Sequence, residues 1–120
     1  MIHDEICTYE VAKLAKENGF NEYVEAFYAE DCNTAHTQGS EKWNEYKGKY
    51  AAPTQSLLQR WLREEKNIDI AIVPLYAGGY SYIVYNIHCR DNRVVNANAG
   101  YDTYELALED AIAYSLENLV

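Results

Sequence analysis

Apolar positions recur at helical spacing in three segments of the chain, 9–18, 53–66 and 103–119. Each segment carries an apolar stripe on one side and mostly charged or amide side chains on the other. Thr8 and Thr103 precede the first and last of these stripes and are good N-cap residues. The pattern therefore predicts three amphipathic helices.

Between the second and third helices, the spacing of the apolar positions changes to two. Residues 68–76 and 80–89 alternate in this way, and the glycine-rich residues 77–79 between them favour a hairpin turn. A polar turn at 90–92 leads into a third strand at 93–99. We therefore expect the C-terminal half to have the order α-β-β-β-α, with antiparallel strands.

The N-terminal half has a mixed pattern. Aromatic and β-branched residues favour a strand at 23–29. The polar stretch 31–48 is predicted to be a long loop, followed by a short strand within 46–52. Loops of this length are uncommon in compact domains, and they are often functional or mobile.

Together these elements predict a single α+β domain that spans residues 1–120. Its antiparallel sheet should contain three to five strands, with helices packed mainly on one face. In the strand at 80–89, Ile83 lies on one face, and Tyr80 and Tyr82 lie on the other. The isoleucine face is the better candidate for contact with the core.

Tyrosine is unusually frequent in this chain. There are 12 tyrosines in 120 residues, which is about three times the usual share. Tyrosine favours binding interfaces because it offers a large rigid surface with a polar tip, but it also packs well when half-buried in a strand. Both interpretations stay open. If the tyrosine face is open, Tyr80, Tyr82 and His88 are the predicted partner-binding residues.

The chain is strongly acidic, with a formal net charge of −9. Nucleic acids and anionic membranes attract Lys and Arg, so neither is an expected partner. The helix–three strands–helix order is similar to that of double-stranded RNA-binding domains, which place basic residues at the start of the last helix. This chain has Asp102, Glu105, Glu109 and Asp110 there. We expect a protein partner, with basic proteins as candidates.

The three cysteines, Cys7, Cys32 and Cys89, are too few and too widely spaced for a disulfide framework. Free thiols are typical of the reducing cytoplasm, which is the expected location. The acidic N-terminus, 1–5, lacks the basic and apolar regions of a secretory signal. No stretch approaches the ~20 apolar residues of a membrane span.

Metal binding and catalysis have little support in the sequence. Cys32 and His36 have a spacing that zinc ligands use, but the adjacent His88 and Cys89 would point to opposite faces of a strand. No cysteine or carboxylate motif points to a catalytic site, so we predict no catalytic residue, metal or cofactor. The alternatives to a protein-binding module are a structural homodimer and, after it, a small enzyme or zinc protein.

Several short motifs extend across most of the chain. They are Tyr9-Glu10-Val11-Ala12-Lys13-Leu14, Gly19-Phe20, Phe27-Tyr28, Ala51-Ala52-Pro53-Thr54, Leu57-Leu58-Gln59-Arg60-Trp61-Leu62, Tyr101-Asp102-Thr103-Tyr104 and Leu106-Ala107-Leu108. In these motifs the chain resembles a loose group of small proteins encoded by phages, prophages and other mobile elements of bacteria. The resemblance implies an accessory protein of such an element, and it transfers no functional residue to this chain.

Overall fold

The structure is a computed structural model that describes residues 4–87 and 93–120. It divides into two compact units, Met1–Thr54 and Gln55–Val120, which are called unit 1 and unit 2. The described residues form three α-helices and two three-stranded antiparallel sheets, so the predicted α+β class is confirmed. The extent of a single domain over 1–120 stays a prediction.

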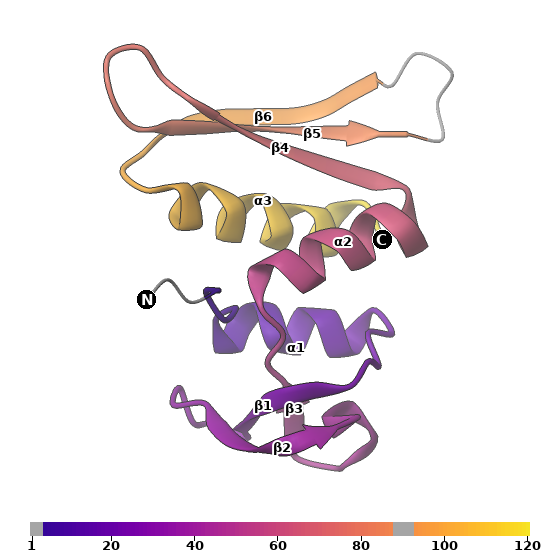
Figure 1. Ribbon diagram of the computed structural model, residues 1–120. Helices are drawn as coiled ribbons and strands as arrows, with labels where there is room; N and C mark the ends of the chain where they lie inside the picture. The colour runs from indigo at the N-terminus through magenta and orange to yellow at the C-terminus, as the bar shows by residue number, and fades with distance from the viewer. Residues whose placement is uncertain (1–3, 88–92) are drawn as a thin grey trace. The chain divides into compact units, whose positions relative to one another are not determined.

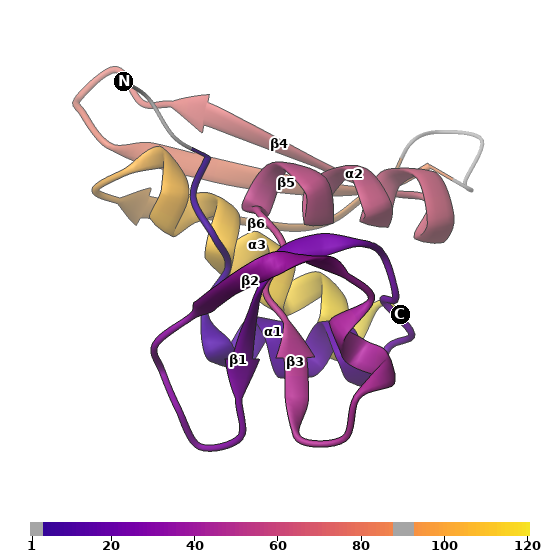
Figure 2. The ribbon, with the colours of Figure 1, turned by 60° about the horizontal axis from the view of Figure 1, so that its bottom comes forward.

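Unit 1 combines helix α1 (Tyr9–Glu17) with a small sheet (Figure 2). Thr8 caps α1 as predicted, because its hydroxyl oxygen accepts a hydrogen bond from the Val11 N–H at 3.3 Å. Gly19 follows the end of the helix with a φ of 92°, a conformation that glycine adopts without steric cost. Local sequence chemistry therefore determines both ends of α1.

The sheet of unit 1 has the strand order β2-β1-β3, with β1 (Val24–Ala29) paired antiparallel to both neighbours. The sequence predicts β1 and β3 (Lys49–Ala51) but not β2 (His36–Glu41). The prediction of a loop over 31–48 is wrong, because β2 and a short 3-10 helix, η1 (Trp43–Glu45), lie within it. Every residue of β2 is exposed, so the strand lacks the alternation that would reveal it.

Both faces of β1 are buried, although the strand belongs to a small sheet. On one face, the Phe27 ring packs against Trp43 with centroids 4.5 Å apart, and the Trp43 indole N–H donates to the Val24 carbonyl at 2.9 Å. On the other face, the Tyr28 hydroxyl donates to the Cys7 carbonyl at 2.7 Å. η1 therefore covers the face of β1 that carries Phe27.

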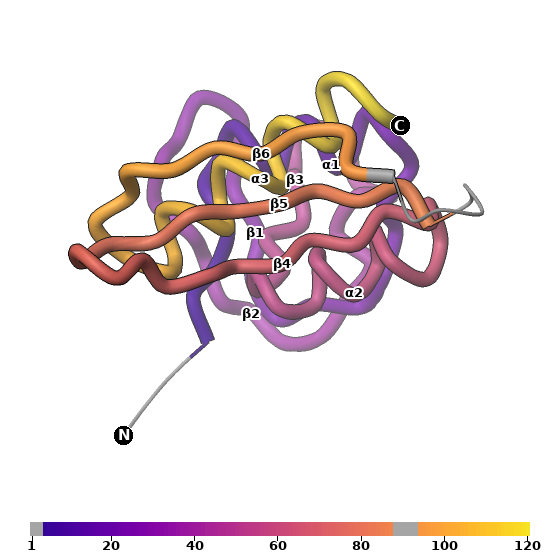
Figure 3. Tube along the Cα trace, turned by 90° about the horizontal axis from the view of Figure 1, so that it is seen from above, coloured from indigo at the N-terminus to yellow at the C-terminus, as the bar shows by residue number. Residues whose placement is uncertain are grey.

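Unit 2 has the predicted order of elements (Figure 1). They are α2 (Gln55–Lys66), β4 (Ile68–Pro74), β5 (Tyr80–Asn86), β6 (Arg93–Tyr101) and α3 (Tyr104–Asn118). The strands lie side by side in the order β4-β5-β6 and all pairs are antiparallel (Figure 3). Figure 1 shows both helices on the same face of this sheet, while no helix or strand among the described residues of unit 2 lies over the other face.

The two helices and the face that they cover form the core of unit 2. Trp61 is buried in this core, as its place in the apolar stripe predicts. Other buried residues of the helices and strands of unit 2 include Leu58, Leu62, Ile70, Val84, Ala107, Leu108, Ala111 and Ile112. The Gln55 side-chain amide joins the helices by donating to the Glu105 carbonyl at 3.0 Å and to the Glu109 carboxylate at 2.8 Å.

Strand β6 contains two irregularities in its pairing with β5. The register skips one residue of β6 at Val95 and another at Gly100. Each extra residue interrupts the simple alternation of faces along the strand. Gly100 has a φ of 93°, so it allows the strand to continue to Tyr101 instead of breaking it after Ala99, where the sequence predicts its end.

Candidate binding surfaces

The face of β5 that carries Tyr80 and Tyr82 lies against the helices. Tyr82 is only 3% exposed, whereas Ile83 on the other face is half-buried. The expectation that the isoleucine face forms the core is therefore wrong for β5. Tyr80 is half-buried, and its ring packs edge-on against Tyr104 with centroids 6.1 Å apart. His88, the third predicted partner-binding residue, lies outside the described residues.

Helix α3 explains why the tyrosine face is the buried one. α3 packs against β5, and its small residues Ala107 and Ala111 are fully buried. Small side chains on the helix leave room for a ring as large as that of Tyr82, because packed cores pair large with small residues. Both faces of β5 are apolar, so alternation could not distinguish them. In β4, Ile68 and Ile70 are buried, as expected.

A polar network surrounds Tyr82 on this covered face. The Tyr82 hydroxyl accepts a hydrogen bond from the Asn96 amide at 2.7 Å. The Tyr101 hydroxyl donates to the Asp110 carboxylate and accepts from the Asn98 amide at 3.2 Å. Burial raises the pKa of both tyrosines, and Asp110 raises it further. Both phenols therefore stay neutral near pH 7, which favours a structural role over that of a nucleophile or base.

The other face of the β4-β5-β6 sheet is open. Val94 on this face is 51% exposed and Val73 is 38% exposed. The strand register assigns to it Asp69, Ala71, Val73, Ser81, Ile83, Tyr85, Val94, Ala97 and Ala99, which are all half-buried or exposed. We call this set the open face. Asp69 is its one charged residue, so the surface is predominantly apolar.

The open face departs from the usual pattern of an antiparallel sheet. A sheet with one solvated face normally alternates apolar residues inward with polar residues outward. Here Ala71, Ile83 and Ala97 form a cross-strand row of apolar residues on the outward face. Reasoning from the sequence missed this surface. The strands at 68–76 and 80–89 carry apolar residues at both odd and even positions. This signal predicts that both faces of the sheet are apolar.

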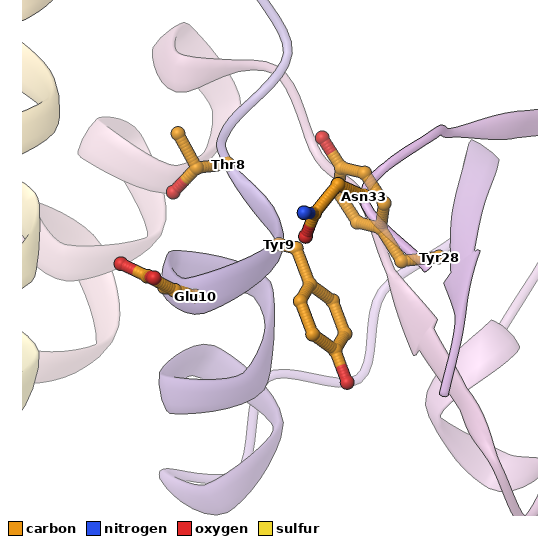
Figure 4. A pocket seen from close by; sticks show the side chains of 5 residues that line it. All are labelled: Thr8, Tyr9, Glu10, Tyr28 and Asn33. Atoms are coloured by element: carbon orange, nitrogen blue, oxygen red, sulfur yellow. The ribbon is translucent and has the colours of Figure 1, made fainter. Parts of the chain in front are cut away.

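Unit 1 contains a pocket of about 330 Å³ beside the start of α1 (Figure 4). It is lined by Thr8, Tyr9, Glu10, Tyr28 and Asn33, and we call it the tyrosine pocket. The Tyr9 and Tyr28 rings meet edge-on with centroids 5.7 Å apart. The Tyr9 hydroxyl accepts a hydrogen bond from the Asp31 N–H at 3.0 Å. Hydrogen bonds therefore hold both rings in place, since the Tyr28 hydroxyl is also bonded.

Lysines near this pocket lie over aromatic rings. The Lys13 Nζ atom is 5.6 Å from the centroid of the Tyr9 ring, and the Lys16 Nζ atom is 4.9 Å from that of Tyr50. Tyr50 in turn packs edge-on against Tyr9, with centroids 5.6 Å apart. Among the described residues of unit 1, no lysine forms an ion pair with a carboxylate. The Lys16 ammonium also donates to the Tyr46 and Lys49 carbonyls, at 3.1 and 2.8 Å, so both rings and backbone oxygens surround it.

The residues considered for zinc binding do not form a site in the described structure. The His36 ring packs against Phe27 with centroids 5.4 Å apart, and the Cys32 thiol contacts a backbone carbonyl. Within residues 4–87 and 93–120, no three His, Cys, Asp or Glu side chains gather closely enough to hold a metal ion. His88 and Cys89 fall outside those ranges.

Comparison of the chain with protein-family models, with curated proteins and with solved structures finds no match. The resemblance to the mobile-element group therefore stays a prediction. In the described part of the chain, no helix has both the length and the apolar character that a membrane span needs.

Proposed function

We propose that the chain is a small protein-binding module that uses the open face of unit 2. The observation that carries the proposal is an exposed apolar surface on one side of a sheet whose other side is packed. Contact with a second protein would remove this surface from water, at about 25 cal/mol per Å² of apolar area. The polar network does not support a catalytic function in the same way, because its Tyr82 and Tyr101 hydroxyls stay neutral near pH 7.

The dimensions of the open face bear on the strength of binding. Three strands of about seven residues cover an area of about 24 Å by 14 Å. A standard interface buries about 800 Å² on each partner. The open face alone therefore favours a weak or transient complex, and a tight one would need neighbouring residues as well.

The net charge of the chain favours a basic partner. The net charge is −9, and the last 20 residues contain no Lys, Arg or His. Their acidic residues are Asp102, Glu105, Glu109, Asp110 and Glu117. Attraction between opposite charges accelerates the association of two proteins, and salt weakens this attraction. With the resemblance to mobile-element proteins, this supports an accessory role in the bacterial cytoplasm.

The test of this proposal is to place charge on the open face without disturbing the core. Val73 and Val94 are both more than one third exposed, so a Val73→Lys/Val94→Lys variant should still fold. Leu106→Lys is the matched control, because Leu106 is 55% exposed in the same unit but lies on α3. Affinity capture from host lysate identifies a partner, whose affinity for the purified variants is then measured.

We expect the double variant to bind the partner at least about tenfold more weakly, which corresponds to 1.4 kcal/mol, and Leu106→Lys to bind normally. Equal affinity of both variants would contradict a role for the open face. Sedimentation of the purified chain at several concentrations tests whether it forms a homodimer. A dimer that forms in the original chain and not in the double variant would assign the open face to a second copy instead.

A further inference from the structure

We infer that the tyrosine pocket of unit 1 binds an alkylammonium group, the chemistry shared by a lysine side chain and a free polyamine. The inference does not rest on the open face, which lies in unit 2. It rests on the charge of the pocket, the nature of its walls and its size.

The charge of the pocket favours a cation. Its lining residues include the acidic Glu10 and no Lys, Arg or His. Glu10 lies in the first turn of α1, where the positive end of the helix stabilises an ionised carboxylate. The Thr8 hydroxyl and the Asn33 amide add oxygen atoms that can accept hydrogen bonds. An anion, the usual ligand of a helix N-terminus, would meet the Glu10 charge instead.

The walls of the pocket supply the second argument. Aromatic rings attract ammonium groups through their negative faces. Ammonium groups of the chain already lie over tyrosine rings of unit 1, since Lys13 lies over Tyr9 and Lys16 over Tyr50. Because hydrogen bonds hold Tyr9 and Tyr28, the walls are ordered before any ligand arrives.

The size of the pocket supplies the third argument. About 330 Å³ is at the lower end of the range of small-molecule sites. This volume suits a short alkyl chain that ends in an ammonium group. Figure 4 shows Thr8 and Glu10 on one side of Tyr9, with Tyr28 and Asn33 on the other. Tyr9 lies between the two pairs, so its ring is the wall that a bound ammonium group would meet from either side.

The test is an NMR titration of the full chain with four probes. Nα-acetyl-lysine methylamide and spermidine carry alkylammonium groups, Nα-acetyl-norleucine methylamide is a neutral analogue, and inorganic phosphate is the anion. We expect at least one ammonium probe to shift the signals of Thr8, Tyr9 and Asn33, while the neutral and anionic probes leave them unchanged. Glu10→Gln should weaken this binding at least fivefold. Glu17→Gln is the matched control, at an exposed position in the last turn of α1. This variant should bind the ammonium probe as tightly as the original chain.

The two ammonium probes also distinguish the sources of the ligand. Binding of the lysine amide alone would indicate a side chain of another protein, and binding of spermidine alone would indicate a free polyamine. The inference is overturned if neither probe shifts the pocket signals, or if norleucine amide or phosphate shifts them equally. It is also overturned if Glu10→Gln and Glu17→Gln weaken binding to the same extent, because attraction would then reflect overall charge.

Discussion

Two tyrosines of unit 2 should make the stability of the protein depend on alkaline pH. Burial and Asp110 raise the pKa of Tyr101 and Tyr82 above the ordinary value of 10.0. A raised folded pKa contributes stability that is fully present below the unfolded pKa and is lost as pH rises towards the folded one. We therefore expect the free energy of unfolding, measured with urea, to fall above pH 10, and to fall less steeply in Tyr101→Phe.

The control for this experiment is a tyrosine without such surroundings. Tyr76 is fully exposed, so Tyr76→Phe should keep the pH dependence of the original chain. The comparison matters because lysines also lose their charge in this range. If Tyr101→Phe and the original chain lose stability in parallel above pH 10, the Tyr101 hydroxyl does not contribute to the effect.

The same residues illustrate what sequence can say about a single position. Asn96 and Asn98 are poor strand formers, so by propensity alone they weaken the prediction of a strand at 93–99. In the structure their amides donate to the hydroxyls of Tyr82 and Tyr101. A buried hydroxyl needs such a partner. Asn96 and Tyr82 lie on different strands, so spacing along the chain does not reveal this pair.

At the scale of elements, the β4–β5 hairpin depends on two glycines that are not equivalent. Gly78 and Gly79 have φ angles of 103° and 82°. A Cβ atom at Gly79 would lie 2.8 Å from the Tyr101 carbonyl oxygen, whereas one at Gly78 would meet nothing within 4 Å. We expect Gly78→Ala to lower the free energy of unfolding by about 1–3 kcal/mol through backbone strain. Gly79→Ala should cost more.

Urea unfolding of both variants measures this difference directly. The two substitutions share the unfavourable φ, so the difference between them isolates the contact with the β6 backbone. Equal losses of stability would mean that β6 shifts at Tyr101 without cost. A Gly79→Ala variant that fails to fold, beside a folded Gly78→Ala, would agree with the expected order.

The elements that sequence predicts well are those with local determinants. Thr8 and Thr103 cap their helices by accepting from the N–H three residues later, as their positions suggest. Strand β2 is missed because all its residues are exposed and its pairing with β1 joins distant segments. The bulges in β6 are missed for a related reason. An extra residue has meaning only relative to the partner strand.

At the scale of the whole molecule, the two candidate surfaces both depend on distant segments. The tyrosine pocket joins the start of α1 to Tyr28 and Asn33. The open face exists because both helices of unit 2 lie on one side of the sheet (Figure 1). The sequence predicts that arrangement, but it does not reveal which face of β5 the helices cover. The size of the Tyr82 and Ala111 side chains is one factor in that choice, and it acts only after the elements meet.

The charge of the whole molecule leads to a prediction about salt. A net charge of −9 makes the folded chain repel itself, and the lysines of unit 1 do not pair with its carboxylates. The exposed Arg60–Glu64 pair, with 2.9 Å between Nε and Oε2, contributes only about 0.3–0.5 kcal/mol. Salt should therefore screen more repulsion than attraction. We expect NaCl to raise the urea midpoint, with most of the gain below about 0.15 M, where the Debye length is about 8 Å. A midpoint that falls with salt would mean that attractive pairs dominate the folded state.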